Sequence, residues 1–314
     1  MPLVLQIGAN SHSEDFAFAH DPVPRLIAKG WSAILIEPQP TAASALRAKY
    51  ASNVQISVVQ AAFCPDATAR LVPLYFINGT KSLGANESDI RCVGEAILGT
   101  ASFSRSHVLQ FQRWYRYTPS QCAKCAKRLG RPLPPTCMRQ LYTANLDVAD
   151  VPCARPEQIV ATSGGGSGGS SSSGGSGGNS GSGRGGREDE LHSHRRPADA
   201  VIVDVEGEDD HVVLRYLELT AALGRPSVLV YEHAHLRSNR RSALESLLQL
   251  AGMTPYRHAE MKQPPPGRLQ EPSERRHWAT MRHILARVNT HDNAVWVRAA
   301  ALGGAAAARA AAVR

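Results

Sequence analysis

Two short apolar segments near the start of the chain each end in a residue that suits a nucleotide-like ligand. Leu3–Ile7 is followed by Gly8, and Ala33–Ile36 is followed by Glu37. A glycine after one strand lets the backbone approach a ligand closely, and an acidic residue after the next can accept hydrogen bonds from ribose hydroxyls. These residues predict a site for a cofactor that contains adenosine.

Two apolar segments in the second half of the chain, at 200–203 and 227–231, are followed by ionisable residues. These are Asp204, Glu206, Glu232, His233 and His235. A carboxylate or an imidazole at the end of a strand could remove a proton from a bound hydroxyl group. Three other interpretations stay open: the acids cap the next helix, the histidines are ordinary loop residues, or the carboxylates hold a hard cation.

Four cysteines form a second candidate site, namely Cys122, Cys125, Cys137 and Cys153. A Cys-x-x-Cys pair with two later cysteines is a plausible tetrahedral set for a structural zinc ion. Two disulfides in an oxidising compartment and unpaired thiols are the alternatives. Cys64 and Cys92 stand alone in the sequence and are expected to be packing residues.

Strand and helix patterns alternate in the two ends of the chain and must position these residues. Strands are expected at 3–7, 33–37, 54–59, 200–204, 227–232 and 293–298, with helical patterns between most of them and an edge-type strand at 71–77. Because strands separated by helices need right-handed crossovers, the two ends predict one doubly wound, Rossmann-like α/β sheet.

The centre of the chain interrupts this pattern. We expect the first half of the α/β domain at 1–83, an insertion rich in cysteine and proline at 84–162, and a disordered glycine and serine linker at 163–196. The second half of the domain is expected at 197–298 and an alanine-rich tail at 299–314. The long insertion is expected to lie over the cofactor edge and to shape the acceptor pocket.

The charge and hydropathy of the chain limit its partners. Lys and Arg number 35 against 27 Asp and Glu, for a net charge of +8. Basic residues form small groups, such as Arg195-Arg196, Arg237–Arg241 and Arg275-Arg276. Without a long basic stripe, no nucleic-acid partner is expected. No apolar run reaches the roughly 20 residues of a membrane span, and no targeting segment is visible, so the compartment stays open, with the cytoplasm as the default.

Four segments together resemble the FkbM-type S-adenosylmethionine-dependent methyltransferases. They are Gln6–Asn10, Ile36–Pro40, Val203–Gly207 and Val230–Glu232, at successive predicted strand ends. The resemblance covers about a third of the chain. It implies a class I methyltransferase fold, S-adenosylmethionine as cofactor, and methylation of a hydroxyl oxygen on a carbohydrate or another small metabolite.

The resemblance also implies roles for individual residues. Gly8, Ala9 and Asn10 would form the turn against the methionine moiety of the cofactor, and Glu37 would bind the ribose. Gln60 and Ala61 would lie near the adenine. Asp204 and Glu206 would face the transferred methyl group and the acceptor, with His233 as a further candidate base.

Two positions depart from the family pattern and keep a second interpretation open. Gln6 stands where the family commonly has aspartate, and His12 stands where it has a second loop glycine. A methyltransferase-like interaction protein without catalysis is therefore the alternative. A nicotinamide dehydrogenase is disfavoured, because the loop that begins at Gly8 lacks the three-glycine spacing that places a pyrophosphate against a helix N-terminus.

Overall fold

The computed structural model describes residues 1–10, 21–64, 70–78, 101–106, 108–109, 118–132, 145–154, 198–205, 208–220, 226–234, 236–256 and 293–298. The predictions for the linker at 163–196 and the tail at 299–314 lie outside these residues, as do Glu206, His12, His235, Cys92 and Cys137.

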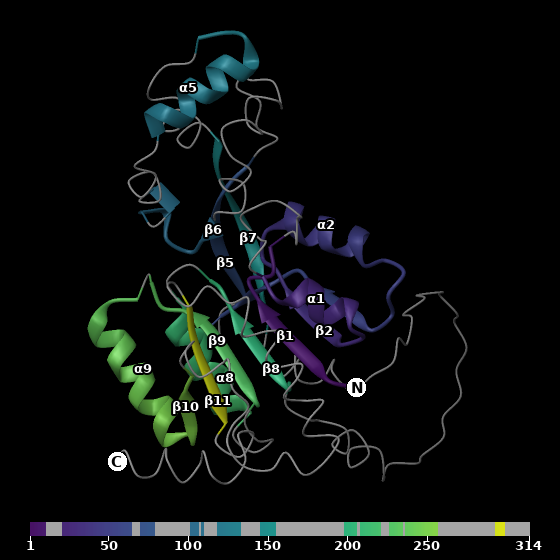
Figure 1. Cartoon of the computed structure of the whole chain (residues 1–314), viewed down its shortest axis with the longest axis vertical. Helices are drawn as coiled ribbons and strands as arrows, with labels where there is room; N and C mark the ends of the chain where they lie inside the picture. The colour runs from purple at the N-terminus through teal and green to yellow at the C-terminus, as the bar shows by residue number, and fades with distance from the viewer. Residues whose placement is uncertain are drawn as a thin grey trace, which may run out of the picture.

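A seven-stranded sheet forms the centre of the fold (Figure 1). Its strands are β1 (Leu3–Ile7), β2 (Ser32–Ile36), β3 (Ile56–Val59), β8 (Ala200–Val203), β9 (Val228–Glu232), β10 (Met253–Pro255) and β11 (Asn293–Arg298). They lie in the order β10-β11-β9-β8-β1-β2-β3. The neighbours from β9 to β3 pair in parallel, and β11 pairs antiparallel with both β9 and β10.

Helices cover both faces of this main sheet, as a doubly wound sheet requires. One face packs against α1 (Val23–Ala28) and α2 (Pro40–Lys49), and the other against α8 (Asp209–Leu219) and α9 (Ser238–Leu250). Because side chains alternate along a strand, Leu5 of β1 packs in the core under α8 and α9 while Val4 packs in the core under α1 and α2. The prediction of an α/β fold is confirmed.

A second, four-stranded sheet has the order β4-β7-β5-β6. It consists of β4 (Ala62–Phe63), β5 (Leu71–Ile77), β6 (Ala101–Ser102) and β7 (Leu146–Ala154). Figure 1 shows β5, β6 and β7 rising away from the main sheet, with α5 (Thr118–Leu129) at the far end. We call β5, β6, β7 and α5 together the arm.

The strand predicted at 71–77 forms, but it belongs to the arm and not to the α/β domain. All seven residues of β5 pair antiparallel with β7, so the main sheet gives way to the second sheet after β3, well before the boundary expected at residue 83. The partner β7 was not predicted, because Pro152 and two aspartates interrupt its apolar pattern. Only Cys153 and Ala154 of β7 also pair with β4, so Pro152 and both aspartates lie where β7 has a neighbouring strand on one side only, as at a sheet edge, which tolerates such residues.

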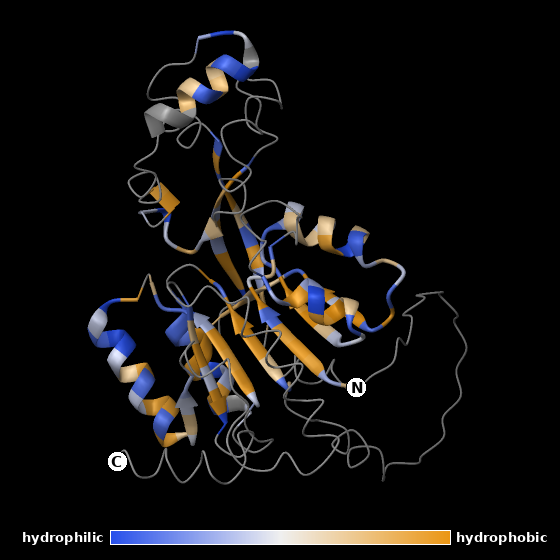
Figure 2. Cartoon of the chain, viewed as in Figure 1, coloured by the Kyte–Doolittle hydropathy of each residue, from blue (hydrophilic) through white to orange (hydrophobic). Residues whose placement is uncertain are grey.

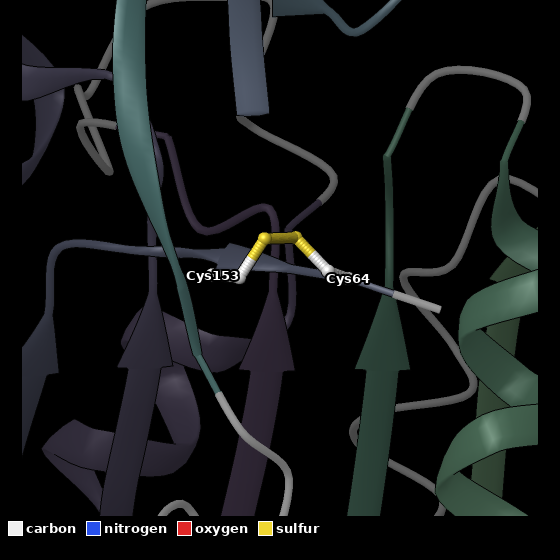
Figure 3. Close-up of a disulfide and its surroundings, with 2 residues drawn as sticks. All are labelled: Cys64 and Cys153. Carbon is white, nitrogen blue, oxygen red and sulfur yellow. A yellow bond between two sulfur atoms is a disulfide. The ribbon is translucent and has the colours of Figure 1, made fainter. Parts of the chain in front are cut away.

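A disulfide joins the base of the arm to the end of β4. Cys64 bonds to Cys153 across 89 residues of sequence (Figure 3). The short β4 contributes to two cores by alternation: Phe63 packs into the main-sheet core, whereas Ala62 and Cys64 pack with Leu74 of the arm. The disulfide therefore fixes the position at which the chain leaves the α/β domain.

No helix in the described part of the chain is long and apolar enough to cross a membrane.

Candidate functional site

The predicted site residues lie along one edge of the main sheet. Gly8, Glu37, Gln60, Asp204 and Glu232 each stand at or just after the end of a parallel strand. The carboxyl ends of parallel strands meet at the same edge, and ligands of open α/β sheets bind there at the switch point where the strand order reverses. In this sheet the switch point lies between β1 and β8.

Gly8 occupies the switch point, and no other residue type fits there. Its φ is +82°, and a Cβ atom built on it would lie 1.8 Å from the carbonyl oxygen of Asp204. The Asp204 amide in turn donates to the carbonyl of Ile7 at 2.9 Å. The absence of a side chain at Gly8 therefore lets the ends of β1 and β8 approach each other.

The loop after β1 folds back onto the end of β2. The Gly8 and Ala9 amides donate to the carbonyl of Ile36 at 2.9 and 3.1 Å, and the Asn10 amide donates to Glu37 Oε2 at 2.7 Å. Asn10 has a φ of +50°, which a short polar side chain tolerates. These three amides are used within the protein, whereas a dinucleotide loop must point its amides at phosphates.

Glu37 is buried, with 5% of its surface exposed. Its two oxygens accept from the amides of Asn10 and Gln39, each at 2.7 Å. Burial raises the pKa of Glu37 from 4.5 to about 7, because the loss of hydration outweighs the two hydrogen bonds, which favour the ionised form. A carboxylate has about four lone-pair positions, so two remain for donors such as a pair of ribose hydroxyls.

The next two predicted residues, Gln60 and Ala61, follow β3. The Gln60 side chain turns toward α2, where its Oε1 accepts from Arg47 Nη1 at 3.1 Å. Ala61 is buried in the main core. A contact with the adenine base at this strand end would therefore involve the backbone more than these side chains.

The candidate catalytic residues follow β8 and β9. Asp204 is exposed at the end of β8, and His233 is half-buried just after β9. Because Val203 pairs with Tyr231, Asp204 comes next to the end of β9 in the register of the sheet. The structure thus brings Asp204 and His233 to neighbouring strand ends, and Glu206 lies outside the described residues.

Helix capping does not account for Asp204. Helix α8 begins at Asp209, and its N-cap residue is Glu208, without a side-chain cap bond. The fully buried Asp209, which was not predicted as a site residue, instead accepts from the Glu232 amide at 3.2 Å through Oδ1. It ties the start of α8 to the end of β9. Its signal in the sequence is an acidic residue in the first turn of a helix that follows a strand.

An acidic cluster beside this edge has the composition of a cation site. Ligand atoms of Glu208, Asp210 and His211 lie within 4.8 Å of one another. However, Arg240 donates to Asp210 through Nε at 2.6 Å and again through Nη2, and it also bonds to Glu208 at 3.3 Å. The guanidinium already compensates these carboxylates, so the cluster is explained as an ion-pair network between α8 and α9.

The glutamine at position 6 has a specific partner. Gln6 is buried, and its Nε2 donates to Asp21 Oδ2 at 3.0 Å, while Asp21 Oδ1 accepts from the Val23 amide at 2.9 Å. Removal from water raises the pKa of Asp21 to about 6. An aspartate at position 6 would place a second carboxyl group against Asp21, and the amide avoids that repulsion.

The cysteine prediction needs a correction. Cys153 is bonded to Cys64, which was expected to be a packing residue, and Cys122 and Cys125 are also disulfide-bonded. A sulfur in a disulfide has no thiolate with which to bind zinc. The zinc set of Cys122, Cys125, Cys137 and Cys153 is therefore not formed, and disulfides are the alternative that the described cysteines follow.

Comparison of the chain with protein-family models, with curated proteins and with solved structures gave no match.

Proposed function

We propose that this chain is a methyltransferase that binds S-adenosylmethionine at the carboxyl edge of the main sheet. The acceptor would be a hydroxyl group on a carbohydrate or a small metabolite. One observation carries the proposal: Gly8 lies at the switch point, and the buried Glu37 stands at the end of the neighbouring strand.

The order of the strands supports this proposal. Numbered by their appearance in the chain, the strands of the main sheet lie in the order 3-2-1-4-5-7-6, and the seventh is antiparallel to its neighbours. The usual dinucleotide-binding sheet has the order 3-2-1-4-5-6, without the strand that here stands between the fifth and the sixth. This difference weighs against a nicotinamide cofactor, the alternative with the same glycine and acidic residue.

The bonding at Glu37 supports the same choice. The amides of Asn10 and Gln39 already orient the carboxylate, so its side chain loses little conformational entropy when it accepts two ribose hydroxyls. The amides of Gly8 and Ala9 are bonded to Ile36 and are not available to a pyrophosphate. This arrangement suits a nucleoside without phosphates.

S-adenosylmethionine supplies an electrophilic methyl group on a sulfonium when it is bound. The chain must hold the acceptor oxygen in line with that methyl group and must accept the proton of the acceptor hydroxyl. Asp204 is an exposed carboxylate at the switch point, and His233 is an imidazole at the adjoining strand end. Either side chain could take the hydroxyl proton as the methyl group leaves the sulfur and bonds to the acceptor oxygen.

The bond between Gln6 and Asp21 weakens one reason for a non-catalytic interpretation. The carboxyl group that is missing at position 6 is present on Asp21, hydrogen-bonded to the Gln6 amide. The departure from the family pattern at this position is therefore compensated within the same core.

Equilibrium binding of S-adenosylhomocysteine to the purified chain, measured by calorimetry, tests the proposal. Glu37→Ala should weaken binding roughly a hundredfold, because two hydrogen bonds to a charged acceptor are lost. Glu245→Ala is the matched control, since Glu245 is a carboxylate of α9 that pairs with Arg241, and it should leave the affinity unchanged. No detectable binding to the wild-type chain at millimolar ligand would overturn the proposal.

A further inference from the structure

The net positive charge of the chain is concentrated in one segment. Residues 96–146 contain eight Lys and Arg residues and no Asp or Glu, so this segment carries a charge equal to the +8 of the whole chain. The rest of the sequence is balanced, including the short basic groups outside the segment. Such asymmetry indicates an anionic partner for the segment more than a general effect on solubility.

Helix α5 presents part of this charge on one face. Lys124, Lys127 and Arg128 are all exposed, whereas Cys122 and Cys125 are buried and disulfide-bonded. Residues three and four apart are neighbours on a helix, so the three cations form one cluster, which we call the α5 basic face. The two buried cysteines lie on the other side of the helix.

The α5 basic face has no acidic neighbour in its own segment. None of the ion pairs found among the described residues includes Lys124, Lys127 or Arg128. Lys127 and Arg128 lie in the last turn of α5, where cations complement the helix dipole. The dipole explains neither Lys124 nor the absence of acids from the whole segment.

The position of α5 indicates a long ligand. Figure 1 shows the helix at the end of the arm that lies farthest from the main sheet, and Figure 2 shows hydrophilic residues along it. The arm is tied to this edge through β4, which directly follows Ala61 and whose next residue, Cys64, is bonded to Cys153 of β7. A ligand that contacts both α5 and this edge must extend along the arm, which a polymer can do and a small metabolite cannot.

We propose that the α5 basic face binds an anionic polysaccharide, carboxylated or sulfated, that carries the hydroxyl group to be methylated. This inference rests on the proposed function, because the carbohydrate acceptor comes from there. Nucleic acid is the other common polyanion. It is disfavoured because every cysteine in the described residues is disulfide-bonded, which is typical of secreted and other oxidised proteins.

Binding of fluorescent heparin fragments, a sulfated probe, tests the proposal by anisotropy on the full chain. Combined Lys124→Glu, Lys127→Glu and Arg128→Glu substitutions should weaken binding about tenfold or more, and the same residues changed to Gln should weaken it less. The control with equal charge change is Arg25→Glu, Lys29→Glu and Arg237→Glu, three exposed cations of the main domain. Its affinity should stay within about twofold of the wild type once bulk charge is screened by salt.

S-adenosylhomocysteine binding is measured on the same proteins to separate the two proposals. Unchanged heparin affinity in both α5 variants, or equal loss in the control, would overturn the role of α5. So would tighter binding to single-stranded DNA or to anionic phospholipid vesicles than to heparin and polygalacturonate at equal charge. Heparin binding that depends on α5 in a chain without nucleoside binding would support the surface and overturn the methyltransferase.

Discussion

A change in pH perturbs the proposed cofactor site without altering any side chain, because Glu37 titrates near neutrality. Burial raises its pKa to about 7, and only the ionised carboxylate can accept from two amides and two ribose hydroxyls together. Those hydroxyls stabilise the ionised form, so ligand binding lowers the pKa and releases a proton below pH 7. The apparent Kd should therefore rise about tenfold for each pH unit below 7 and level off above pH 8.

Calorimetric titration with S-adenosylhomocysteine between pH 5.5 and 8.5, in buffers of different ionisation enthalpy, measures both the affinity and the released proton. Glu37→Gln removes the titrating group, and its weaker binding should show no dependence on pH in this range. A wild-type affinity that is constant from pH 5.5 to 8, with binding present, would refute the assignment of the ribose to Glu37.

Ionisation of Glu37 strengthens ligand binding, but it lowers the stability of the chain without ligand. The pKa of Glu37 is higher in the folded state than its ordinary value of 4.5, so folding favours the protonated form. Its contribution is fully present below about pH 4.5 and is lost as pH rises through 7, for a change of roughly 3 kcal/mol. Because ligand affinity rises over the same range, the increase in Tm on adding ligand should grow between pH 6 and 8.

Three variants test the architecture around the site by chemical denaturation. Gly8→Ala adds a Cβ against a carbonyl oxygen in a left-handed conformation and should cost about 3 kcal/mol or more. Changing both Cys64 and Cys153 to Ser opens an 89-residue connection and should cost about 2–4 kcal/mol. Arg240→Leu leaves the Asp210 carboxylate, which is mostly buried, without its guanidinium and should cost about 2–4 kcal/mol.

Matched changes elsewhere in the chain separate these effects from generic ones. Gly30 has a φ of +83° but open space around it, so Gly30→Ala should cost only about 1 kcal/mol, and equal losses at Gly8 and Gly30 would contradict the steric argument. Arg241 pairs with Glu245 on the surface of α9, and its loss should cost less than about 0.5 kcal/mol. For the disulfide, intact wild-type stability in the double serine variant would be the contrary result.

The strands of the main sheet and the edge at which the candidate site residues lie could be predicted from the sequence, for a local reason. Apolar runs that stop at Gly8, Glu37 and Asp204 record strand ends directly, and parallel pairing brings those ends to one edge. Both faces of such a sheet are covered, so its strands are continuous apolar segments that are easily recognised.

The tertiary structure alone decided the partners of residues far apart in the chain. No local pattern indicates that Cys64 bonds to Cys153, that β5 pairs with β7, or that Gln6 donates to Asp21. Each of these depends on which surfaces meet after the chain has crossed the sheet, and spacing in sequence does not encode that. The edge at which the candidate site residues meet is therefore a property of local sequence, and the arm beside it is a property of the fold.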